Sequence, residues 1–228
     1  MGTSYNSSIV TDGLVLCLDA ANPRSYPGSG TSWSDLSGNG NNGTLTNSPT
    51  FDSVSKSFNF DPTNSYLTIP NSSSLNTDYI TVEYVLSNSH SIHAYPIVNK
   101  SSEATEGRFW RIGVTSPGKF YFWIEVGSET YYNISADNTF SSGIYHLFCT
   151  YDGSIMKMYI NGEQQSQTAS VSGVLYGSSG DVEIARNKFY NPDRYASHKS
   201  YLFRIYNRAL SEQEIRQNYN ATRGRYGN

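Results

Sequence analysis

The chain is poor in charge, and it has no excess of basic residues. Charged residues make up 15% of its 228 residues, with 16 Lys and Arg against 19 Asp and Glu, which gives a net charge of −3. A typical soluble domain carries about 25% charged residues. Nucleic-acid binding draws most of its affinity from clustered positive charge, so we exclude nucleic acid as a partner.

Long apolar runs and a cysteine framework are also missing. No stretch of about 18 apolar residues occurs, so we expect no insertion into a membrane. Residues 1–10 have neither the basic start nor the apolar stretch of a secretory signal, which predicts a chain without a signal peptide. Cys17 and Cys149 lie far apart, each inside an apparent strand. We predict two free, buried thiols.

Uncharged polar and aromatic residues replace the missing charge. Ser, Thr and Asn fill roughly a third of the chain, and 19 Tyr and 3 Trp add large apolar area to a modest aliphatic content. The length fits one ordinary domain, which we expect to span residues 1–228 with its core at about 9–220.

Short runs in which apolar and polar residues alternate recur along the chain. They are residues 14–18, 58–69, 80–86, 110–114, 120–126, 145–151, 155–160, 163–168 and 201–206. Residues 115–118 predict a hairpin turn, and Asp152-Gly153 and Asn161-Gly162 join three runs into a meander. This pattern predicts an all-β, two-sheet antiparallel sandwich whose first and last strands are adjacent.

One short helix is predicted near the C-terminus. Ser211 is followed three residues later by Glu214, the spacing of a capping box in which each residue bonds the backbone of the other. Leu210 and Ile215 are placed to form the accompanying hydrophobic staple. We therefore expect a helix that begins near Glu212 and docks through these two apolar residues.

Several short motifs follow one another from about residue 13 to 220. They are GLVL at 13–16, DLSGNGNNG at 35–43, FNFD at 58–61, YLTIP at 66–70, YHLFCTYDG at 145–153, YING at 159–162 and RIYNRALS at 204–211. Their order and spacing resemble the laminin-G-like, concanavalin A-like lectin/glucanase jelly-roll superfamily, particularly its bacterial and phage branch. Tyr84 and Tyr145 stand where that family often has Trp, and both keep an aromatic side chain in the core. The resemblance implies a jelly roll, in a family that serves in adhesion, carbohydrate binding, enzyme appendages and virion surfaces.

Glycoside hydrolysis is the enzymatic hypothesis that the resemblance raises, but the acidic residues do not favour it. The hydrolase signature Glu-x-Asp-x-x-Glu is absent. On one strand, Glu125 and Glu129 would lie about 13 Å apart, beyond the separation of roughly 5 to 9.5 Å in glycosidases. Asp181 and Glu183 would share a face at about 6.7 Å, but we expect both in water with no raised pKa. We therefore predict no catalytic residues.

Metal and nucleophile signals are equally weak. His90, His93, His146 and His198 show no zinc-ligand spacing, and we interpret His146 as structural. Many relatives of the resembling family bind calcium through loop carboxylates, yet residues 37–43 add no acid to Asp35. Turn formation explains the Asn-Gly content of this loop. We expect no cofactor and keep calcium only as an alternative.

The best ligand candidate is an aromatic face on the predicted hairpin. Tyr121 and Trp123 alternate with apolar residues of the run 120–126, and Arg111 falls on the same face if the hairpin closes. Aromatic rings beside hydrogen-bonding groups suit the C–H faces and hydroxyls of a sugar. Coverage of the rings by a loop or another subunit is the alternative. Finding Trp123 buried within its own domain, under a segment such as 131–142, would contradict this recognition surface.

Together these observations favour a non-enzymatic surface module. We expect a phage virion structural protein, capsid-decorating or tail-associated, whose partners are virion proteins, its own copies or host-surface glycans. Its expected location is the virion surface or otherwise extracellular. A secreted carbohydrate-binding or adhesion module is the first alternative, and a glycoside hydrolase is the second.

Overall fold

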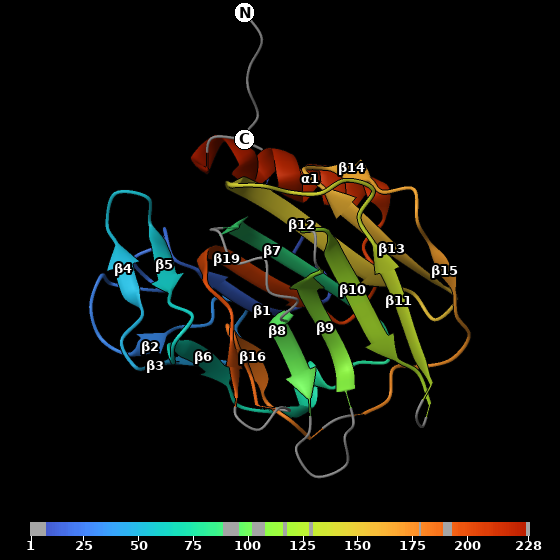
Figure 1. The fold of residues 1–228 in the computed structure, drawn as a ribbon, viewed down its shortest axis with the longest axis horizontal. Coiled ribbons are helices and arrows are strands. Elements are labelled where there is room, and N and C mark those ends of the chain that lie inside the picture. Colours follow the sequence, from blue (N-terminus) through green and yellow to red (C-terminus); the bar gives the residue numbers. More distant parts are fainter. Residues whose placement is uncertain are drawn as a thin grey trace, which may run out of the picture.

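A computed structural model describes residues 8–88, 96–101, 108–115, 118–127, 130–177, 179–188 and 193–226. Two large antiparallel sheets face each other, and a helix lies against the outside of one of them (Figure 1). This arrangement confirms the predicted all-β two-sheet jelly roll. No helix in the described ranges is long and apolar enough to span a membrane.

The first sheet carries both the earliest and the latest strands of the chain. Its order is β14 (Glu163–Gln164), β13 (Ile155–Ile160), β12 (Gly143–Tyr151), β7 (Ile80–Asn88), β19 (His198–Tyr206), β5 (Ser57–Phe60) and β4 (Thr50–Asp52). Beside this path, β1 (Leu14–Asp19) pairs with β19, and β15 (Ala169–Ser170) pairs with β13. The pairing of β1 with β19 confirms that the first and last strands are adjacent.

The second sheet has eight strands. Its order is β11 (Tyr131–Ser135), β10 (Phe120–Glu125), β9 (Arg108–Val114), β8 (Pro96–Ser101), β16 (Val182–Ile184), β6 (Tyr66–Ile69), β3 (Gly43–Thr46) and β2 (Ser32–Trp33). One register row, buried against the first sheet, is apolar in seven neighbouring strands: Ile134, Phe122, Ile112, Val98, Ile184, Leu67 and Leu45. A small pair, β17 (Arg186–Asn187) and β18 (Arg194–Tyr195), and two short 3₁₀ turns, η1 (Ser73–Leu75) and η2 (Arg223–Arg225), complete the described elements.

Residues 58–69, predicted as one run, form two strands in different sheets. β5 ends at Phe60 and β6 begins at Tyr66. Between them, the Asp61 side chain accepts hydrogen bonds from the backbone amides of Thr63 at 2.7 Å and Asn64 at 3.1 Å. This Asx turn carries the chain from one sheet to the other. The prediction of one continuous strand is wrong because period-two alternation resumes after the turn and conceals it.

The predicted hairpin and meander are both present. β9 pairs with β10, although Ser116 and Pro117 of the connecting turn lie outside the described residues. β12, β13 and β14 form the meander, and its third strand is shorter than the predicted run 163–168. Asn161 and Gly162 adopt positive φ angles of 53° and 83°, as an Asn-Gly turn between twisted strands requires.

The C-terminal helix α1 (Glu212–Thr222) begins where the capping box predicts. The Ser211 hydroxyl accepts from the Glu214 amide at 3.3 Å, and the Glu214 carboxylate accepts from the Ser211 amide at 2.8 Å. Leu210 and Ile215 pack in one cluster with side chains from β12, β13 and β19: Phe148, Tyr159 and Tyr206. Figure 1 shows α1, in red, beside the β12 and β13 end of the first sheet.

A buried ionic network joins α1 to the first sheet. Glu83 of β7 is fully buried, and one of its carboxylate oxygens lies 2.7 Å from Arg204 Nη1 and 2.9 Å from His146 Nε2. Asn218 of α1 donates to the other oxygen at 2.8 Å. Burial opposes ionisation of Glu83, but Arg204 and His146 outweigh it and hold the pKa of this carboxyl below its usual range.

A second buried histidine lies inside the sandwich. The Tyr84 hydroxyl is 2.6 Å from His198 Nε2, and His198 Nδ1 is 3.3 Å from the Ala196 carbonyl. A neutral ring protonated at Nδ1 satisfies both partners. Burial lowers the pKa of His198 to about 4. Tyr84 therefore lies in the core as expected, whereas Tyr145 is half-buried and packs at the edge of the core.

Replacing Ser211 tests the capping box at the start of α1. Ser211→Ala removes the acceptor for the Glu214 amide, and we expect the free energy of unfolding to fall by about 1 kcal/mol in urea denaturation. Ser172→Ala, at an exposed position, serves as the matched control. Equal midpoints for the two variants would show that the cap contributes nothing to stability.

The free energy of unfolding should fall as the pH drops from 7 to 4. Folded His198 stays neutral down to about pH 4, whereas in the unfolded chain it takes up a proton near 6.5. The unfolded state therefore binds more protons in this window, and the stability lost to His198 alone approaches about 3 kcal/mol by pH 4. Urea denaturation at each pH measures the slope, and His198→Gln should flatten it by about one proton; an unchanged slope would contradict this assignment.

Candidate functional site

The outer face of the second sheet presents a continuous row of mostly polar residues. One register row crosses all eight strands, through Asn133, Trp123, Arg111, Asn99, Glu183, Thr68, Thr44 and Ser32. The neighbouring row is the apolar one that faces the core. Strand alternation therefore places one aromatic ring, three amide or guanidinium groups, one carboxylate and three hydroxyls on the outer side of the sheet. Trp123, Asn99 and Glu183 of this row are nevertheless buried.

The three predicted site residues do come together on this face. The Arg111 guanidinium carbon lies 4.6 Å from the Trp123 ring centroid and 5.8 Å from the Tyr121 ring centroid. On the other side, the Trp123 and Tyr131 rings stack with centroids 4.8 Å apart and planes inclined by 22°. We call Arg111, Tyr121, Trp123 and Tyr131 the outer-face cluster. A cation over an aromatic face and two stacked rings hold its members in fixed positions.

Gly113 determines where Tyr121 lies. These residues are register partners on β9 and β10, and a Cβ atom on Gly113 would fall 2.4 Å from the Tyr121 hydroxyl oxygen and 2.5 Å from Cζ. The Tyr121 ring therefore lies across the glycine, in space that any other residue would occupy. This gives the β9–β10 part of the face a flat aromatic surface.

The recognition surface in the form first predicted, with Trp123 as its open ring, is contradicted, because Trp123 is buried under Tyr131 of its own domain. Trp123 points away from the sandwich core, as predicted, but it is only 7% exposed because Tyr131 and Arg111 of the same chain cover it. Tyr131, which lies in the segment named as a cover, is 43% exposed. The exposed ring of this cluster is thus Tyr131, on β11, a strand that was not among the predicted runs. The signal was the pair Tyr131-Tyr132 at the start of an alternating run.

The expectation that Glu183 lies in water is also wrong. Val182 and Ile184 take the core as predicted, yet Glu183 is fully buried on the outer side. Arg186 contacts both of its oxygens, with Nε 3.2 Å from Oε2, and the Arg186 guanidinium carbon lies 3.8 Å from the Tyr66 ring centroid. Burial raises the pKa of Glu183, and Arg186 partly opposes that rise. The cause is the β17–β18 pair, which begins directly after β16 and places Arg186 against the carboxylate.

The other acidic candidates have separate surroundings. The half-buried Asp181 side chain accepts from the Asn71 backbone amide at 2.9 Å, which links the segment before β16 to the segment after β6. Glu125 is buried on β10, and Glu129 lies outside the described residues. Among the described residues, Asp181 and Glu183 are thus hydrogen-bonded within the protein, and Glu125 is buried.

The histidines and cysteines take structural positions where they are described. His146 is buried against Glu83, which agrees with its interpretation as structural, and His90 and His93 lie outside the described residues. Cys17 and Cys149 are free and buried, as predicted. Burial raises the pKa of both thiols, although Arg204 partly opposes this at Cys17.

The loop considered for calcium is organised by hydrogen bonds. Asp35 Oδ1 accepts from the amides of Cys17 and Ser37, and Oδ2 accepts from the Ser37 hydroxyl and the Asn41 amide, all within 2.7–3.0 Å. Within the described ranges, no group of three or more His, Cys, Asp or Glu side chains is arranged to hold a metal ion.

Comparison with known proteins gives a family match and a set of similar structures. The sequence profile described as "Concanavalin A-like lectin/glucanases superfamily" matches residues 61–216. No curated protein matches the sequence.

Several solved binding domains share the fold. The binding domain of Paraclostridial Mosquitocidal Protein 1 superposes with a TM-score of 0.72 at 18% identity, over 92% of this chain and 52% of that one. The receptor binding domain of botulinum neurotoxin C/D mosaic serotype gives 0.73 at 14%, over 93% and 52%. The ligand binding domain of botulinum neurotoxin serotype D, solved with N-acetylneuraminic acid, gives 0.71 at 13%, over 93% and 52%. The chain spans about half the length of these structures, and such identities show the fold alone.

Substitutions at Trp123 and Tyr131 test whether Trp123 is the buried ring of the stack and Tyr131 the exposed one. Because Trp123 is covered by Arg111 and Tyr131, Trp123→Ala should lower the free energy of unfolding by about 2–4 kcal/mol, measured by urea denaturation. Tyr131→Ala, at the exposed end of the same stack, should cost less than about 1 kcal/mol. Equal, small losses for both variants would show that Trp123 is not packed as described.

Proposed function

The chain belongs to the concanavalin A-like lectin/glucanase superfamily, and from that premise we propose that it is a non-enzymatic surface module that binds glycans. The observation that carries the proposal is the outer-face cluster: an exposed Tyr131 ring supported by Trp123, with Arg111 and Tyr121 alongside. The similar structures are described as binding domains, and one was solved with a sugar acid bound, which supports a binding role.

Each member of the cluster has a distinct role in the proposed site. Tyr131 supplies an apolar ring face on which the C–H groups of a sugar pack, and its hydroxyl is a hydrogen-bonding group at the ring edge. Arg111 and Tyr121 provide polar groups beside it. Trp123 holds Tyr131 flat and is a positioning residue, because its own ring is covered.

The surroundings of the buried acids support a role without catalysis. A glycosidase needs one carboxyl that protonates the leaving oxygen and a second that acts as base or nucleophile. Glu83 and Glu183 are both fully buried and bonded to arginines, Arg204 and Arg186. Because each carboxylate is buried and paired with a guanidinium, neither can reach a substrate to protonate it.

We also propose where this module is displayed. It forms a single laminin-G-like jelly-roll domain over residues 1–228, with its core at about 9–220, and it is displayed on a phage virion as a capsid-decorating or tail-associated protein. The low charge and the abundance of Tyr, Ser and Asn suit a surface exposed outside the cell.

Mass spectrometry and immunogold labelling of purified particles test the assignment. Recovery of the protein only as a free secreted species would favour a secreted adhesion module instead.

A glycan array tests the binding function. The full chain should bind at least one glycan class, and Tyr131→Ala should reduce that signal about tenfold or more because the ring platform is lost. Tyr131→Phe keeps the ring and serves as the matched control, with binding within about threefold of wild type. A full chain that binds no glycan, or a Tyr131→Ala variant that binds like wild type, would contradict the proposed function or the proposed surface, respectively.

A further inference from the structure

A further exposed tyrosine, Tyr176, joins the second sheet beside β10. Val126 and Leu175 form an antiparallel bridge, and the Tyr176 amide donates to the Glu125 carbonyl at 2.9 Å. On the other side of β10, the Val126 amide donates to the carbonyl of Thr130, just before β11, at 3.0 Å. Backbone groups of consecutive strand residues point to opposite neighbours. Tyr176 and β11 therefore lie on opposite sides of β10.

The Tyr176 side chain is directed to the outer face of this sheet. Val126 and Leu175 are both buried in the core cluster between the two sheets. Because side chains alternate along an extended chain, the next residue, Tyr176, points away from that core, as Glu125 does. Tyr176 is 37% exposed. The outer face that carries Tyr131 thus has a second accessible ring.

Tyr131 and Tyr176 lie at the two ends of one register row. Glu125 is the strand partner of Tyr131, and Tyr176 is its neighbour on the other side. Neighbouring strands lie about 4.8 Å apart, so the backbones of the two tyrosines are separated by about 10 Å. Glu125, between them, is only 2% exposed. What this row presents to a ligand is therefore two rings, with the intervening carboxylate buried.

The adjacent register row supplies hydrogen-bonding groups. It runs through Asn133, Trp123 and Arg111, parallel to the line from Tyr131 to Tyr176. Asn133 is exposed and Arg111 is half-buried, whereas Trp123 is covered. A ligand that lies across both tyrosines would therefore have an amide and a guanidinium along one flank.

Two rings at this spacing suit an extended sugar chain. In such a chain, one pyranose residue spans about half of the distance between the two tyrosines, so the first and third residues meet the two rings. A β-1,4 linkage turns each residue over relative to the one before it. The first and third residues therefore present the same C–H face, and each can pack on one ring.

We propose that the outer face binds linear β-1,4-linked glycan chains of at least three residues, laid across the strands from Tyr131 to Tyr176. The inference rests on the proposed glycan-binding function and adds a substrate class and a second aromatic residue to the site. A chain long enough to reach both rings makes the second contact within one complex, which raises its affinity above that of a shorter chain.

Isothermal titration calorimetry of the full chain tests the dependence on chain length. The probes are cello-, chito-, manno- and xylo-oligosaccharides of one to six residues, with α-1,4-linked malto-oligosaccharides for comparison. In at least one β-1,4 series, affinity should rise about tenfold or more between the disaccharide and the trisaccharide. Absence of this step in all four series, or a step of equal size in the malto series, would overturn the proposal.

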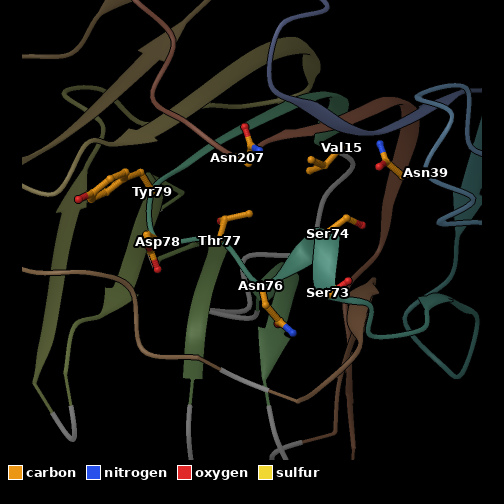
Figure 2. A pocket seen from close by; sticks show the side chains of 9 residues that line it. All are labelled: Val15, Asn39, Ser73, Ser74, Asn76, Thr77, Asp78, Tyr79 and Asn207. Atoms are coloured by element: carbon orange, nitrogen blue, oxygen red, sulfur yellow. The ribbon is translucent and has the colours of Figure 1, made fainter.

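Substitutions assign the step to the two rings. Tyr176→Ala and Tyr131→Ala should each remove it, because each leaves one ring. Tyr176→Leu keeps an apolar side chain and should give the same loss, so the test stands even if Tyr176→Ala does not fold. The matched control is Tyr79→Ala, which should keep the step. Tyr79 is 39% exposed and lines a separate pocket beside β1 and η1 (Figure 2).

A step that persists in folded Tyr176→Ala or Tyr176→Leu, or that is lost equally in Tyr79→Ala, would overturn the assignment to Tyr176. The glycan array keeps this inference separate from the proposed function. If Tyr131→Ala loses array binding but no β-1,4 series shows a step, the outer-face function stands and the chain inference fails. If the full chain binds no glycan, both are overturned.

Discussion

The buried charge of Glu83 is the constraint on which the arrangement of the C-terminal region depends. A carboxylate removed from water is tolerated only when cations and donors surround it. Here they come from β19, β12 and α1, through Arg204, His146 and Asn218. Asn218 also accepts from the Val10 amide at 2.8 Å, so the same network holds the segment before β1. Helix docking and closure of the first sheet therefore satisfy one charge together.

This network also determines which face remains for recognition. α1 and its apolar cluster cover the outer side of the first sheet around β12, β13 and β19. On the second sheet, the β17–β18 pair closes the Glu183 end of the polar row, with Arg186 over Tyr66. What stays accessible is the β9–β11 end, where Tyr131 is exposed and Arg111 and Tyr121 are half-buried. The fold thus places the accessible aromatic group at one end of one sheet.

The sequence predicts local structure well, but it predicts poorly which residues pack over the outer faces of the strands. The capping box at Ser211 and the Asn161-Gly162 turn depend on neighbours within a few residues. A short sequence motif is therefore enough to predict their geometry. Alternation also assigns the correct face to Trp123 and Glu183, because side chains of a strand alternate strictly. It carries no information about what lies over that face. Tyr131 and Arg186 come from strands that alternation did not reveal, so the burial of Trp123 and Glu183 beneath them was not predicted.

The outer-face cluster depends on rings that are fixed before a ligand binds. An aromatic side chain that contacts a weakly held, hydroxylated ligand gains most when its ring is already fixed, because less freedom is lost on binding. Tyr131 is fixed by stacking on Trp123, which in turn lies under Arg111. In a chain with only 15% charged residues, rigid rings beside amides and hydroxyls are the recognition chemistry that the composition provides, and this chemistry suits hydroxylated partners.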